Sequence, residues 1–276
     1  MIKILVDSTA DCPRKDPVFD LFVPLTVSVG AQDYRDGIDL DADRFYELLT
    51  TAQEFPKTSQ PSPDAFAALF EQAKQNGDEI LCFCVSSALS GTYQSACIAK
   101  QMVDFEGIYV LDTLLVSHLI GVLAEYAAKR IREGADAQCI FHECEVLKHR
   151  IKVFAGLDTL EYLYKGGRLS RAGAAVGQIA GIKPIITLTE DGKVNAGIKA
   201  IGIPRAIQTI LAKIGEYDLD NRFPVYTLYT KGTENTEKLE AKLAAAGIPV
   251  TDRRQVGPTI GAHVGPGVYG ILFVTK

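Results

Sequence analysis

Short apolar segments alternate with segments of helical periodicity through the first half of the chain. Apolar runs at Lys3–Val6, Ile80–Val85 and Ile108–Leu111 predict β-strands. Between the first two, Ser62-Pro63 is typical of a helix start, and the residues that follow repeat apolar side chains every three or four positions. This alternation predicts βαβ units around a mainly parallel sheet.

Further segments extend this pattern. Val23–Val29 predicts another extended segment, and Asp41 predicts the cap of a helix that follows it. The longest apolar segment, Leu111–Ala128, contains Asp112 and Glu125. These charges favour a buried helix over a membrane span, so no integral membrane segment is predicted.

The second half combines hairpin and helix signals. Ile151–Gly156 predicts a strand, and two apolar runs flank Asp191-Gly192, a strong hairpin signal. Asp158 and Glu161 resemble a capping pair before a short helix. Further helices are predicted at Arg171–Ile182, Pro204–Ile214 and Thr236–Ala246, and strands at Pro224–Tyr229, near Pro249 and at Tyr269–Thr275. The sequence therefore predicts an α/β fold of two domains, a mainly parallel domain at 1–150 and an α+β domain at 151–276.

Composition narrows the class of protein. The 276 residues are 47% apolar, which suffices for sizeable cores. The net charge of −5 argues against a nucleic-acid partner. Six cysteines and no visible signal peptide predict reduced thiols in the cytoplasm.

The turn after the predicted strand Ile80–Val85 is rich in hydroxyl groups. Ser86, Ser87, Ser90 and Thr92 surround Gly91, and a helix is predicted to follow. Open α/β sheets bind ligands at such strand ends, and hydroxyls with a helix N-terminus suit an anionic head group. Helix capping explains a turn of this composition equally well.

Other polar segments allow both structural and functional interpretations. Lys57–Ser62 contains a helix cap, and Gly257–Gly267 predicts a Gly/Pro-rich loop that holds one histidine, His263. Arg168 after Gly166-Gly167 is typical of a solvated arginine at a helix end. Asp7-Ser8-Thr9 could hold a metal or phosphate, although a turn with a helix cap is favoured.

Three residues resemble metal ligands in type but not in spacing. Cys139, His142 and Cys144 match no common zinc pattern. We expect them on one helix, with two of them facing the core.

Six of these segments occur together in an order that resembles the DegV family of bacterial fatty-acid-binding proteins. The matching segments are Asp7–Asp11, Val23–Leu25, Lys57–Ser62, Ser86–Tyr93, Lys165–Ser170 and Gly261–Gly267. They span nearly the whole chain, and the ordered set is far more specific than any one segment.

The resemblance implies a two-domain α/β protein with one long-chain fatty acid buried between the domains. It implies that Thr58 and Ser90 hold the carboxylate, that Arg168 and His263 complete the polar network, and that no cofactor and no catalytic residue is needed. The supporting positions in the same loops are Ser59, Gly91, Thr92 and Gly261.

The best-understood members of the family present their fatty acid to a separate fatty acid kinase, which makes an acyl phosphate. Kinase-partnered relatives carry an Arg-Thr pair where this chain has Ile201-Gly202. Lipid binding is therefore the better supported part of the resemblance. The alternative is an enzyme that acts on an acyl or small carbonyl substrate through Ser90 as nucleophile and His263 as base or covalent ligand.

Overall fold

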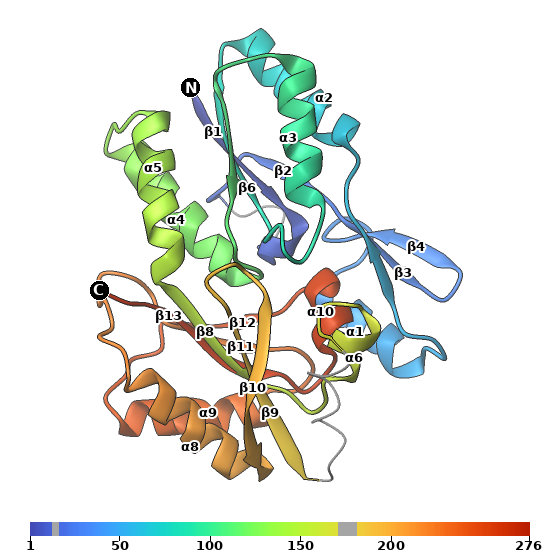
Figure 1. Cartoon of the computed structure of the whole chain (residues 1–276), viewed down its shortest axis with the longest axis vertical. Coiled ribbons are helices and arrows are strands. Elements are labelled where there is room, and N and C mark those ends of the chain that lie inside the picture. Colours follow the sequence, from blue (N-terminus) through green and yellow to red (C-terminus); the bar gives the residue numbers. More distant parts are fainter. Residues whose placement is uncertain (13–16, 171–180) are drawn as a thin grey trace.

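The computed structural model describes residues 1–12, 17–170 and 181–276 (Figure 1). Its first sheet is wholly parallel and has the order β2-β1-β6-β7. The strands are β1 (Ile2–Asp7), β2 (Leu21–Val23), β6 (Glu79–Cys84) and β7 (Ile108–Asp112). The predicted parallel sheet in the first half is confirmed.

Alternating side chains give this sheet two apolar faces. Leu5 and Cys82 face the helices α2 (Pro63–Asn76) and α3 (Thr92–Val103). Val6 and Phe83 face the opposite layer, which is formed by α4 and α5. These two helices span His118–Arg132 and Ala137–Leu147.

The second sheet is mixed and has the order β10-β9-β8-β13-β11-β12. Its strands are β8 (Ile151–Gly156), β9 (Ile182–Leu188), β10 (Val194–Ile201), β11 (Tyr226–Tyr229), β12 (Asp252–Gln255) and β13 (Tyr269–Val274). One face packs against α8 (Gly202–Ile214) and α9 (Glu234–Ala245). The predicted hairpin is confirmed as β9–β10, with Gly192 at a φ of 76° in its turn.

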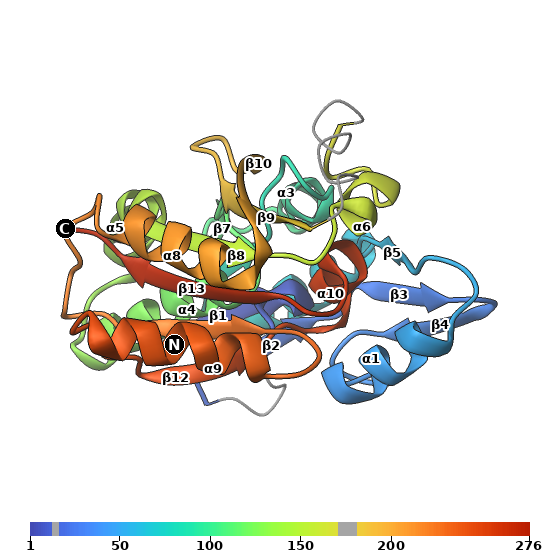
Figure 2. The same ribbon diagram turned by 90° about the horizontal axis from the view of Figure 1, so that it is seen from below.

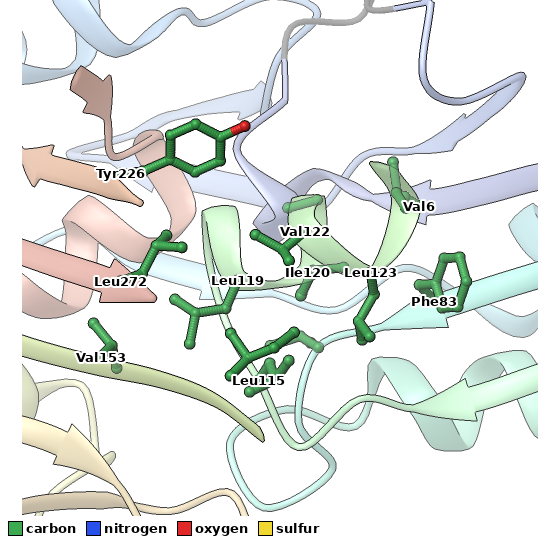
Figure 3. Close-up of a cluster of buried hydrophobic side chains, with 14 of the residues drawn as sticks. Val6, Phe83, Leu115, Leu119, Ile120, Val122, Leu123, Val153, Tyr226 and Leu272 are labelled. Carbon is green, nitrogen blue, oxygen red and sulfur yellow. The ribbon is translucent and has the colours of Figure 1, made fainter. Parts of the chain in front are cut away.

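Helix α4 joins the two sheets through one continuous core. Its residues Leu119 and Val122 lie between Phe83 of the first sheet and Val153 and Leu272 of the second (Figure 3). Because α4 is apolar on several faces, it can bury side chains against both layers at once. The strands of the first sheet precede Ile151 and those of the second follow it.

A small sheet that the sequence analysis missed holds one side of the candidate site. It has the order β4-β3-β5 and packs with α1. These elements are β3 (Thr26–Val29), β4 (Gln32–Arg35), β5 (Lys57–Ser59) and α1 (Ala42–Thr51). Figure 2 shows them at one end of the molecule, beside α10 (Pro258–Val264). The extended segment predicted at Val23–Val29 is in fact divided between β2 and β3.

Local cap signals were predicted well, with one exception. Asp41 and Ser62 accept hydrogen bonds from Arg44 N and Ala65 N at the starts of α1 and α2. The capping pair predicted before α6 (Glu161–Lys165) is wrong, because Leu160 occupies the cap and Asp158 instead pairs with Lys183 Nζ at 2.7 Å.

Three other predictions differ from the structure, and one falls mostly outside the described residues. The helix expected from Leu111 begins only at His118, because β7 continues to Asp112 and a loop follows. The predicted loop at Gly257–Gly267 contains α10, and the strand expected near Pro249 is β12. The helix predicted at Arg171–Ile182 falls mostly outside the described residues, and Ile182 begins β9.

The three possible metal ligands lie on α5, but only Cys144 of them is buried. Within the described ranges no group of three or more His, Cys, Asp or Glu side chains could hold a metal ion. Nor does any described helix have the length and apolar character that a bilayer span requires.

Candidate ligand-binding site

An apolar pocket lies between the two sheets. Its walls come from the loop after β6, from α4, from strands of the second sheet and from α10. Valine, leucine and isoleucine dominate the lining, including Val85, Leu119, Val153, Leu188 and Ile260. A pocket with this lining suits an apolar ligand.

The four polar residues singled out from the sequence all line this pocket. Thr58 comes from β5, Ser90 from the loop before α3, Arg168 from the segment after α6, and His263 from α10. They are distributed over more than 200 residues of sequence. The structure thus brings together four side chains from separate parts of the chain on the wall of one apolar pocket.

Thr58 and His263 contact each other directly, with 2.9 Å between Thr58 Oγ1 and His263 Nε2. Thr58 is positioned because β5 pairs with β3, which places Val27 opposite it. Burial and the nearby Arg168 charge lower the pKa of His263 to about 4, so the ring is neutral at pH 7.

The other ring nitrogen of His263 is buried and has no hydrogen-bond partner within the described part of the chain. It lies against Gly166, where any side-chain carbon would collide with Nδ1. The ring therefore fits only because position 166 lacks a side chain.

Arg168 carries the positive charge of the site. Its Nε donates to Leu89 O at 2.9 Å and its Nη1 to Gly166 O at 2.6 Å. It forms no ion pair with an acidic side chain among residues 1–12, 17–170 and 181–276. Burial lowers the pKa of the guanidinium from its ordinary value, yet arginine stays charged in proteins. The pocket thus holds a cation whose charge is not neutralised by a described neighbour.

Ser90 is held by a short turn and by Thr92. Its N–H and that of Leu89 both donate to Ser86 O, at 3.1 and 3.0 Å. The hydroxyls of Ser90 and Thr92 lie 2.9 Å apart. Thr92 is the first residue of α3, whose cap residue Gly91 makes no side-chain hydrogen bond to the helix.

The four supporting residues predicted from the sequence do not line the pocket. Ser59 is exposed on β5, and Thr92 is buried behind Ser90. Gly91 lies beneath the side-chain amide of Gln60, and Gly261 lies against the rings of Tyr46 and Phe45.

Four further hydroxyl groups, which were not among the predicted site residues, lie on the pocket wall. Three of them, Thr9, Ser117 and Thr259, donate to the buried carboxylates of Asp7, Asp11 and Asp36, each at 2.5 Å. The fourth belongs to Thr187. Desolvation raises the pKa of Asp36 to about 6 and that of Asp11 well above its ordinary range. Only Asp7-Ser8-Thr9 gave a sequence signal, and its predicted turn and cap are confirmed, since Asp7 accepts from Thr9 N at 2.8 Å.

Comparison with known proteins matches the whole chain to one family. The family model, described as an uncharacterised protein, DegV family, covers residues 1–276. A DegV domain-containing protein of Caldanaerobacter subterraneus is 35% identical over 100% of this chain and 99% of its own length. The chain belongs to the DegV family. The resemblance seen in the ordered motifs of this DegV protein is therefore confirmed.

Solved structures of DegV relatives have the same fold. A protein from Thermus thermophilus described by its fatty-acid binding is 31% identical and has a TM-score of 0.88, with 100% and 99% of the two chains covered. DegV of Bacillus subtilis, described as a fatty acid binding protein, is 29% identical with a TM-score of 0.86 over the same shares. The Fak B3 protein of Streptococcus pneumoniae, loaded with linoleic acid, is 22% identical with a TM-score of 0.88 over 100% of both chains, and this likeness concerns the fold alone.

The alternative of a Ser–His catalytic pair has no geometric support in this DegV protein. His263 Nε2 contacts Thr58, and the Ser90 hydroxyl contacts Thr92. A nucleophilic serine needs its base within hydrogen-bond reach and a third group that orients the base. The buried Nδ1 of His263 has no such partner in the described ranges.

The His263 ring gives stability a pH dependence that glutamine would remove. The ring pKa is about 4 in the folded protein and about 6.5 in the unfolded chain. The unfolded chain therefore binds the proton first, so the contribution of this residue to stability is complete above about pH 6.5 and falls as the pH approaches 4. We expect the free energy of unfolding, measured with urea at several pH values, to fall more for wild type than for His263→Gln as the pH drops from about 6.5 to about 4.

Asp36 has the opposite effect on stability, because its pKa is raised to about 6 and its protonation therefore stabilises the fold below that pH. Since both proteins contain Asp36, this effect cancels in the difference between them. A difference that stays constant from neutral to acidic pH would contradict the neutral, buried state of His263.

The contact between Gly166 and His263 predicts that Gly166→Ala destabilises the fold. The φ of −74° accepts alanine, so the cost comes from the collision with the ring, and overpacking costs about 1–3 kcal/mol. Thermal unfolding measures this loss. Gly215→Ala is the matched control, because Gly215 also ends a helix, with a φ of −64° and no atom closer than 3.4 Å to the added carbon. Equal effects of the two substitutions would argue against the collision.

Proposed function

We propose that this protein binds one long-chain fatty acid, with its carboxylate at Arg168 and its acyl chain in the apolar pocket. The observation that carries the proposal is the partly buried Arg168 guanidinium, which lines an apolar slot without an acidic partner in the described chain. A partly buried charge is costly unless an opposite charge pairs with it, so an anionic ligand would stabilise this guanidinium. Fatty-acid binding by the Thermus thermophilus and Bacillus subtilis relatives supports the same ligand class.

Thr58 and Ser90 supply neutral donors to the same carboxylate in this proposal. We infer that His263 Nε2 carries the ring proton and donates to Thr58 Oγ1, so that the Thr58 hydroxyl proton is left for the ligand. The opposite tautomer would bury an N–H at Nδ1 without an acceptor in the described chain. An unpaired buried N–H costs more than an unpaired buried acceptor. His263 thus orients a donor and does not act as a base.

The acyl chain supplies the bulk of the affinity. Palmitate carries about 14 methylenes, and their burial is worth about 11 kcal/mol before the costs of ordering and association. The polar end adds selectivity, because hydrogen bonds to a carboxylate are stronger than those to a neutral group. The protein should therefore hold a water-insoluble acid and distinguish it from the matching alcohol.

Arg168→Met should weaken palmitate binding about tenfold to a hundredfold, since hydrogen bonds to a charged group contribute about 1.5–3 kcal/mol. Hexadecanol binding should change little, because its head group carries no charge. Titration with both ligands measures the two affinities, and native mass spectrometry of the purified protein identifies any lipid already bound. Arg205→Met on the exposed face of α8 is the matched control. Wild-type protein that is empty and takes up no labelled palmitate would refute the proposal.

Delivery of the bound acid to a fatty acid kinase stays a prediction from the family resemblance. Ile201, which replaces the family arginine, is 79% exposed at the end of β10. We expect wild type to support little acyl phosphate formation with ATP and a DegV-partnered kinase, and Ile201→Arg to support more. Lys199→Arg, two residues away and also exposed, controls for added guanidinium groups. Full activity of the wild type would show that Ile201 does not hinder the kinase.

A further inference from the structure

Ser86 contacts two parts of the pocket, the β9–β10 hairpin and the turn that presents Ser90. It is fully buried and lies two residues beyond the end of β6. Its hydroxyl donates to Gly192 O at 2.9 Å and accepts from Ala88 N at 3.3 Å. Its own carbonyl accepts the N–H groups of Leu89 and Ser90. One residue thus determines the turn that presents Ser90 and also contacts the second sheet.

The partner of this hydroxyl is the tip of the β9–β10 hairpin. In Figure 1 the hairpin extends from the second sheet to the lower end of β6. Ile186, Leu188 and Val194 of the hairpin line the pocket. At the tip, Gly192 packs so closely that a side-chain carbon would collide with Ser86 Oγ and would lie 3.0 Å from Leu114 Cα. The position of the hairpin against the acyl-chain pocket therefore depends on this contact.

We propose that Ser86 is a positioning residue that couples two parts of the site. One is the β9–β10 hairpin, which lines the pocket for the acyl chain, and the other is the Ser90 hydroxyl, which binds the carboxylate of the ligand. The coupling rests on the proposed fatty-acid function. It follows from connectivity, because the Ser86 hydroxyl holds the hairpin while its carbonyl holds the turn that presents Ser90. A ligand that binds with the hairpin in place meets Ser90 already oriented.

The test compares palmitate with hexadecanol, whose chain is the same length and whose head group is neutral. In Ser86→Ala we expect both ligands to dissociate about fivefold faster, because the hairpin loses a hydrogen bond. We also expect palmitate to lose about fivefold more affinity than hexadecanol, because the turn that presents Ser90 loses the hydrogen bond from Ala88 N to the Ser86 hydroxyl and Ser90 is displaced. Stopped-flow displacement and equilibrium titration measure these two quantities.

A double-mutant cycle separates this role from a general loss of stability. In a Ser90→Ala background, Ser86→Ala should no longer change the palmitate-to-hexadecanol affinity ratio, because its effect on the head group acts through Ser90. Ser87→Ala is the matched control, since Ser87 is the exposed neighbour in the same turn. A lower melting temperature with unchanged dissociation rates and an unchanged affinity ratio would overturn the inference.

Gly192→Ala changes the other partner of the Ser86–Gly192 contact and is the variant to measure if Ser86→Ala does not fold. It keeps the Ser86 hydroxyl but blocks the close approach and strains the turn at its φ of 76°, so the hairpin tip is displaced and the same change in affinity ratio is expected. Wild-type protein that binds neither ligand would overturn the proposed function. Wild-type binding with an unchanged ratio in the variant would overturn the role of Ser86 alone.

Discussion

A positive charge at the edge of an apolar slot is the constraint around which the candidate site is arranged. The two hydrogen bonds of Arg168 go to the main-chain carbonyls of Leu89 and Gly166. These carbonyl oxygens accept from two of its five N–H donors and do not neutralise its charge. An anionic ligand does so at low cost, because the guanidinium is already oriented by the protein.

The histidine beside this cation is neutral. Burial of the ring is the larger cause of its lowered pKa, and the charge of nearby Arg168 lowers the pKa further. Gly166 leaves room for the ring and also supplies the carbonyl that holds Arg168. A single glycine thereby contacts both polar groups.

The apolar part of the pocket is a continuation of the core. Leu119 of α4 and Val153 of β8 belong to the cluster that joins the two sheets, and both line the pocket. The walls are therefore as closely packed as an interior, which limits how far they can move. The β9–β10 hairpin differs because its tip is held to the first sheet by the hydrogen bond from Ser86.

The sequence alone determined the local structure of this protein and, through its ordered motifs, its family. Strand periodicity predicted the parallel sheet, and the cap at Ser62 and the turn at Asp191-Gly192 were correct because such signals depend on a few neighbouring residues. The tertiary structure decided the β4-β3-β5 sheet and the helix that carries His263. Those elements are short, and packing between segments distant in the chain stabilises them. The hydroxyls backed by Asp11 and Asp36 had no local signal either, because their hydrogen bonds join residues more than a hundred positions apart.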